Sequence, residues 1–72
     1  MLMIVEVFKT NVQKESETNL IINFIQKLFP NYKINFDLED CDKILRVEAV
    51  ELKPENIVEY VNRLGYVCIP LE

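Results

Sequence analysis

The chain has 72 residues, half of them apolar, and a formal net charge of −4. A chain of this length can build one hydrophobic core, so we expect a single domain over residues 1–72. The negative net charge repels the phosphate backbones of DNA and RNA, and no run approaches the roughly 20 apolar residues that span a bilayer. These properties argue against nucleic-acid and membrane partners and predict a folded globule.

The start of the chain and its cysteines indicate a cellular compartment. Met1–Val5 is apolar but lacks the basic leader and the small-residue cleavage site of a secretory signal. We therefore expect a cytoplasmic protein, in which thiols are usually kept reduced. Cys41 and Cys68 do not have the C-x-x-C spacing of redox motifs, and we interpret both as free.

The first part of the chain predicts a strand and the start of a helix. Met1–Lys9 is rich in β-forming residues that alternate, which predicts a strand with Val5 and Val7 facing the core. After the polar loop Thr10–Glu15, Ser16 is the predicted N-cap of a helix that begins one residue later.

This helix is predicted to be amphipathic and to end before Pro30, which cannot continue it. The next segment, Tyr32–Leu38, alternates apolar and polar residues and is typical of a half-buried strand. The apolar stripe of the helix, at 3.6 residues per turn, consists of Ile21, Phe24, Ile25, Leu28 and Phe29.

The second half of the chain repeats the strand and helix pattern. Ile44–Val50 alternates and predicts a strand paired as a hairpin with the preceding one. Pro54 is tolerated in the first turn of a helix, and Gly65 stands where a left-handed C-cap belongs. Tyr66–Leu71 closes the chain as a strand, and Pro70 indicates an edge position in the sheet.

The element order is βαββαβ. Right-handed crossovers put both helices on one face of a four-stranded antiparallel sheet and leave the other face open, which is a ferredoxin-like α+β sandwich. The expected core consists of Val5, Val7, Ile21, Phe24, Ile25, Leu28, Ile34, Phe36, Leu45, Val47, Val58, Val61 and Leu64.

Four stretches carry a resemblance to a known family: Val5-Glu6-Val7-Phe8, Leu28-Phe29-Pro30-Asn31-Tyr32, Ile34-Asn35-Phe36-Asp37-Leu38 and Leu64-Gly65-Tyr66. Together they resemble the heavy-metal-associated domain family, and the similarity covers nearly the whole chain. The resemblance implies the same fold and a relation to copper chaperones and to modules of metal-transporting ATPases. Members similar to this chain hold a soft metal ion with a MxCxxC motif in the first loop.

The chain departs from that family in this loop. It reads Thr10-Asn11-Val12-Gln13-Lys14-Glu15-Ser16 and contains no cysteine, whereas a Cu(I) site needs thiolates. We therefore carry over no metal ligand and expect no cofactor. The remaining candidate is Cys41, in a predicted turn at the same end, as an atypical metal-handling or redox thiol beside Asp40 and Asp42. Cys68 is interpreted as a small apolar filler of the core.

Catalysis has little support in this sequence. The chain has no histidine and a single glycine, and its one serine is the predicted helix cap, so we expect no enzyme. A small-molecule sensor, as other βαββαβ domains form, is a further alternative, although the first loop has no glycine to cradle a ligand.

The leading hypothesis is a binding module that acts through the open face of the sheet. If Val5 and Val7 face the core, apolar side chains on the alternate positions point outward, and such a patch marks a protein partner or a homodimer interface. The alternative is that terminal residues or side-chain stems cover this patch. The predicted interface residues are Leu2, Ile4, Phe8 and Ile44.

Overall fold

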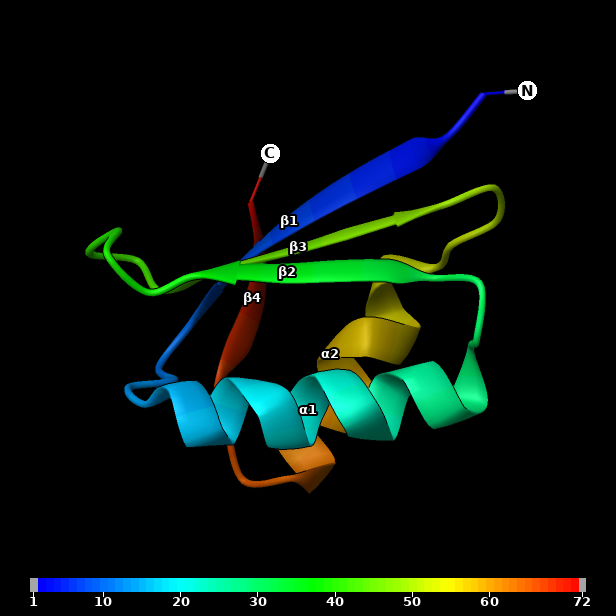
Figure 1. Ribbon diagram of the computed structural model, residues 1–72. Coiled ribbons are helices and arrows are strands. Elements are labelled where there is room, and N and C mark those ends of the chain that lie inside the picture. The colour runs from blue at the N-terminus through cyan, green and yellow to red at the C-terminus, as the bar shows by residue number, and fades with distance from the viewer. Residues whose placement is uncertain (1, 72) are drawn as a thin grey trace.

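The computed structural model describes residues 2–71 and confirms the ferredoxin-like α+β fold. One antiparallel sheet has the strand order β2-β3-β1-β4, and both helices cover one of its faces (Figure 1). β4 is an edge strand, as Pro70 predicts. No helix within the described residues is both long and apolar enough to cross a bilayer. The elements are β1 (Ile4–Thr10), α1 (Glu15–Leu28), β2 (Lys33–Asp37), β3 (Ile44–Ala49), α2 (Pro54–Arg63) and β4 (Cys68–Leu71).

The start of α1 differs from its prediction. The N-cap residue is Lys14, and Ser16 is an exposed residue of the first turn. The Glu17 carboxylate accepts hydrogen bonds from the backbone N–H groups of Gln13 (3.1 Å) and Lys14 (3.0 Å). The carboxylate of a glutamate at the third helical position thus accepts N–H groups at the start of the helix, so the helix does not need a serine hydroxyl as its cap.

The end of α2 confirms its prediction. Gly65 has a φ of 97°, in the left-handed region. The Gly65 N–H donates to the Asn62 carbonyl (2.9 Å) and the Tyr66 N–H donates to the Val61 carbonyl (3.2 Å), which together form a Schellman motif. This turn reverses the chain and directs it into β4.

The facing of β1 is the reverse of the prediction. Phe8 is fully buried and opposes Leu45 of β3, whereas Val5 is 49% exposed and lies with Val7 on the open face. The assignment of Val5 and Val7 to the core, and of Phe8 to the outside, is therefore wrong. Both sets of alternating positions are apolar in this strand, and burying the phenyl ring removes more apolar area from water than burying a valine.

Most of the remaining predicted core is confirmed. Ile21, Ile25, Ile34, Leu45, Val47 and Val61 are buried, and Phe24, Phe36, Val58 and Leu64 pack against them half-buried. Leu28 is 45% exposed, so its assignment to the core is wrong. It ends α1, whose buried apolar positions are the earlier Ile21 and Ile25. Besides Phe8, the predicted core did not include four apolar residues that are buried, namely Val12, Ala49, Ile57 and Cys68, although Cys68 was expected as a filler.

Candidate functional site

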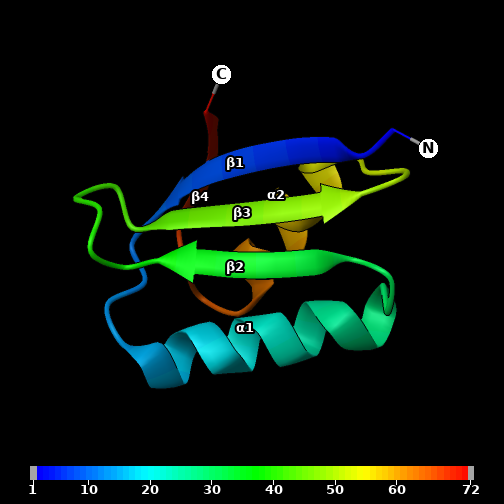
Figure 2. The same ribbon diagram turned by 45° about the horizontal axis from the view of Figure 1, so that its top comes forward.

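The loop between β1 and α1 lies at the same end of the sheet as the β2–β3 loop (Figure 2). The Thr10 hydroxyl donates to the carbonyl of Lys43 and accepts the N–H of Val12 (3.3 Å). The Asn11 side-chain oxygen accepts the N–H of Val67 (2.8 Å). Val12 itself is fully buried in the core. The resemblance implies a metal-binding motif in this loop. The loop instead contributes a buried side chain to the core and hydrogen bonds to the neighbouring segments.

The β2–β3 loop is held against the same end. Lys43 has a φ of 48°, a left-handed conformation that side chains rarely adopt. Three hydrogen bonds hold Lys43 in this conformation. Its backbone N–H donates to the Asp40 carbonyl (3.0 Å), and its ammonium group donates to the Leu38 carbonyl (2.8 Å). Its own carbonyl accepts the hydroxyl of Thr10. The strained residue is thus locked between two loops.

A side-chain hydrogen bond joins the α2–β4 turn to the start of α1. The Tyr66 hydroxyl donates to the Glu17 carboxylate at 2.9 Å. This bond favours the ionised carboxylate and is the main cause that lowers the pKa of Glu17. The same bond favours the neutral phenol and raises the pKa of Tyr66. We call these three connected segments, residues 10–17, 38–43 and 65–67, the loop end.

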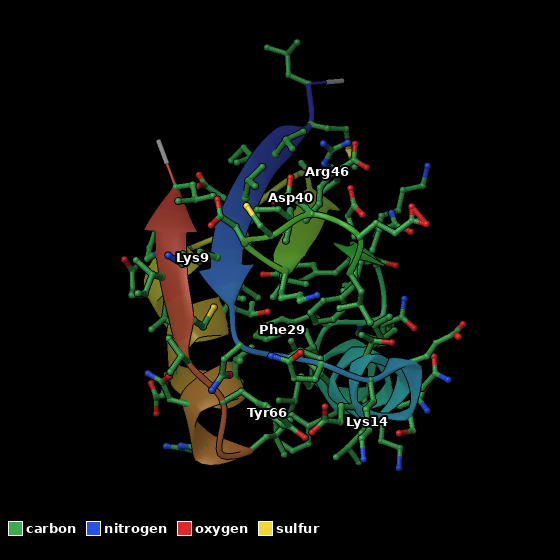
Figure 3. The ribbon with its side chains drawn as sticks, turned by 90° about the vertical axis from the view of Figure 1, so that its left-hand side faces the viewer. Lys9, Lys14, Phe29, Asp40, Arg46 and Tyr66 are labelled. Carbon is green, nitrogen blue, oxygen red and sulfur yellow. The ribbon has the colours of Figure 1, made fainter. Side chains whose placement is uncertain are left out.

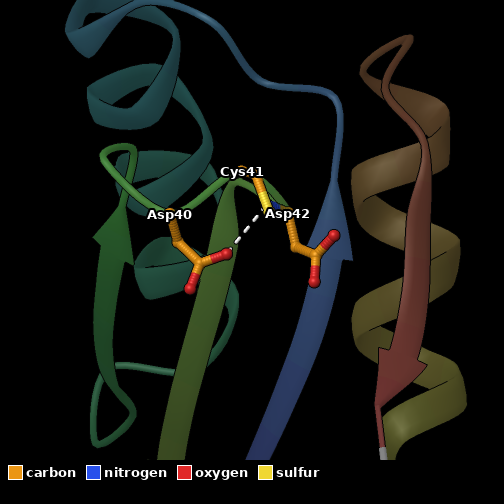
Figure 4. Close-up of side chains that lie close together, drawn as sticks. All are labelled: Asp40, Cys41 and Asp42. Atoms are coloured by element: carbon orange, nitrogen blue, oxygen red, sulfur yellow. Dashed lines mark hydrogen bonds between the residues drawn. The ribbon is translucent and has the colours of Figure 1, made fainter.

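The metal candidate Cys41 lies at the tip of the β2–β3 loop between Asp40 and Asp42 (Figure 4). One ligand atom from each residue lies within 4.8 Å of the others, and the Cys41 thiol is free and exposed. Asp40 accepts the N–H of Asp42 (2.8 Å), and Asp42 pairs with Lys9 (3.7 Å). Both carboxylates already have partners within the protein.

Cys68 is chemically different from Cys41. It is 4% exposed within the core cluster, and this burial raises the pKa of its thiol to about 12. Its interpretation as an apolar filler is confirmed. A thiol in this setting stays protonated and is a poor nucleophile and a poor metal ligand.

The four predicted interface residues do not form one patch. Phe8 is buried, and Ile4 opposes Ala49 on the helical side, where it is 40% exposed. Leu2 precedes β1 and is 91% exposed. Ile44 alone lies on the open face, where it opposes Asp37 of β2. Ile4 and Phe8 were assigned to the open face because the predicted facing of β1 was reversed.

The open face has two chemically different halves. The half formed by β1 and β4 is apolar except for Lys9, and the half formed by β2 and β3 carries several charged residues. Val7 marks the boundary, because it lies between Leu71 of β4 and Arg46 of β3. We define the apolar half by four residues that are exposed or half-buried: Val5, Val7, Ile69 and Leu71. Lys9 also lies on this face, opposite Ile69, whereas Glu6 lies on the helical side, so the charges of β1 gave no signal for its facing.

A hollow of about 360 Å³ opens on the charged half. Val7 and Ile44 contribute apolar surface, and three carboxylates (Asp37, Asp40 and Glu48) lie around a single guanidinium, that of Arg46. Asp40 and Arg46 lie on the side of the sheet away from the helices, whereas Lys14 and Tyr66 lie on the helical side (Figure 3). The ion pairs among residues 2–71 are Lys9–Asp42 and Arg63–Glu59, so neither Arg46 nor Glu48 is paired there.

The chain matches no protein-family model, no curated protein and no solved structure. The resemblance to heavy-metal-associated domains therefore stays a prediction. The function has to be argued from the loop end and the open face themselves.

Proposed function

We propose that this protein is a non-catalytic binding module that docks a polypeptide partner on the open face of its sheet. The observation that carries the proposal is the exposed apolar half, Val5, Val7, Ile69 and Leu71, on the face of the sheet opposite to both helices. Contiguous exposed apolar surface on a small domain is typical of an interaction site. The loop end, by contrast, uses its polar groups internally.

The proposal includes the cellular setting and the origin of the scaffold. Two free thiols, Cys41 and Cys68, are in keeping with a reducing cytoplasm. In this proposal the protein is a scaffold of the heavy-metal-associated type, in which packing residues such as Val12 replace the metal loop and binding takes place on the sheet.

Site-specific photo-crosslinking tests this function. A photoreactive phenylalanine analogue at Val5 is compared with the same analogue at Leu20, which is similarly exposed but lies on α1. In the cells that make the protein, we expect one defined adduct from position 5, none from position 20, and loss of the adduct in Val7→Glu. Equal adducts from both positions, or none from position 5, contradict docking on the open face.

Metal handling is the second candidate, because the ligand atoms of Asp40, Cys41 and Asp42 lie within 4.8 Å of one another. The test is a titration of the reduced protein with Cu(I) and Zn(II), followed by amide NMR shifts. Tight binding that Cys41→Ser abolishes would favour this candidate over docking. Weak shifts spread over many carboxylates, unchanged in Cys41→Ser, would leave the sheet face as the working surface.

A further inference from the structure

We propose that the partner on the open face is a second copy of this chain, packed face to face so that Arg46 of each copy meets Glu48 of the other. This inference rests on the proposed function of the open face and names the partner. It follows from three features of that face: the placement of the two charges, their lack of partners, and the apolar half beside them.

The placement of the charges makes the face complementary to itself. Arg46 and Glu48 are two residues apart on β3, so their side chains point to the same side of the sheet. Val7 lies opposite Arg46, and Val5 lies opposite Glu48. A two-fold axis in the interface, perpendicular to β3 and passing between these positions, puts each charge over its opposite in the other copy.

The same axis brings two apolar residues of β1 together. It exchanges Val5 with Val7, so these two valines of one copy cover those of the other. Ile69 and Leu71 lie to one side of the axis, because β4 pairs with β1 only from Val7 onward. The strands of two aligned sheets cross at about 30°, so the sheets are in contact at the centre of the interface and diverge at its corners. Because β3 and β1 are the two central strands, these contacts lie near the centre of the face.

The contacts across the axis join opposite charges. The hollow has a formal charge of −2 from three carboxylates and one guanidinium, and the second copy adds one guanidinium over Glu48 and one carboxylate over Arg46, so this charge does not change. Arg46 and Glu48 belong to neither ion pair of the described chain. Guanidinium and carboxylate groups form directional, paired hydrogen bonds, so the contact also sets the register of the two copies.

The size of the face predicts the strength of the association. Four strands about 4.8 Å apart, each exposing a stretch of about 20 Å, give a face of roughly 400 Å² per copy. This is about half of the 800 Å² that each partner contributes to a standard interface. The dimer is therefore expected to be weak and reversible, with a dissociation constant in the range of about 10 μM to 1 mM.

A charge exchange between two variants tests the proposal by sedimentation equilibrium. We expect Arg46→Glu alone and Glu48→Arg alone to raise the dissociation constant at least about tenfold, because each places like charges together twice. An equimolar mixture restores association, since both contacts of the mixed dimer again join opposite charges. Lys27→Glu, an exposed change of charge on α1, is the matched control and leaves the wild-type association unchanged.

The possible outcomes separate this inference from the function on which it rests. A mixture that stays monomeric, although both variants keep folded amide NMR spectra, overturns the two-fold packing. A wild type that stays monomeric up to 1 mM overturns it also, and a position-5 adduct with a different polypeptide then leaves the proposed function standing. If Lys27→Glu raises the dissociation constant as much as Arg46→Glu does, the specific pairing of Arg46 with Glu48 is refuted. Absence of both an adduct and a dimer overturns both proposals.

Discussion

The loop end and the open face use their polar groups in opposite ways. At the loop end, Thr10, Asn11 and Tyr66 each bond to a segment distant in sequence. On the open face, Arg46 and Glu48 have no ion-pair partner within residues 2–71. The described residues thus close one end of the sheet and leave charged groups exposed on its open face, so the two regions of one fold differ in what they can bind.

The strand β1 takes part in both regions. Its even-numbered residues Phe8 and Thr10 are buried against the core and the loop end, and its odd-numbered residues Val5 and Val7 form part of the apolar half. Substitutions in this one strand therefore compare the two regions directly.

The largest expected effect compares adjacent residues of β1. Phe8→Ala should lower the free energy of unfolding by about 3–5 kcal/mol, because it leaves a cavity in the core. Val7→Ala should cost less than about 1 kcal/mol, since this side chain is half-buried on the open face. Urea denaturation followed by circular dichroism measures both. If Phe8→Ala does not fold, Phe8→Leu supplies the comparison, and equal losses at positions 7 and 8 would contradict the facing described above.

A smaller effect tests the closure of the loop end. Thr10→Val keeps the shape of the side chain but leaves the Lys43 carbonyl and the Val12 N–H without this partner, which should cost about 1–3 kcal/mol. Ser16→Ala is the control and should change stability by no more than about 0.5 kcal/mol, because Lys14 is the N-cap. A loss of about 1 kcal/mol in Ser16→Ala would instead restore Ser16 as the capping residue.

The smallest effect concerns the bond between Tyr66 and Glu17, which Tyr66→Phe removes. The pKa of Glu17 is lowered from 4.5, so its contribution to stability is present above pH 4.5 and is lost as the pH falls through the folded-state value. The pKa of Tyr66 is raised from 10.0, so its contribution is present below pH 10 and is lost as the pH rises through the folded-state value.

The advantage of the wild type over Tyr66→Phe should therefore form a plateau between about pH 5 and pH 9 and shrink on both sides. Urea denaturation at a series of pH values measures it. A difference that does not change between pH 3 and pH 11 would show that this hydrogen bond does not link the two segments in solution.

Local patterns predicted most of the fold and little of the candidate site. The order of the six elements followed from periodicity, which depends only on near neighbours in the chain. The open face was predicted from the crossover rule and Ile44 was placed on it by alternation, but the residues of β1 that lie there were not predicted. Those residues depend on which side of β1 packs under the helices, and in this strand Leu2, Ile4 and Phe8 offer as plausible an apolar set as Met3, Val5 and Val7.

The sequence by itself determined the element order, the end of α2 at Gly65 and the absence of cysteine from the first loop. Each depends on a local property: hydrophobic period, a φ of 97° that glycine adopts without strain, and the residue types present. Tertiary structure alone decided that Phe8 is core and that Tyr66 meets Glu17 across 49 residues. These features depend on strand register and on contacts between distant segments, which no local pattern encodes.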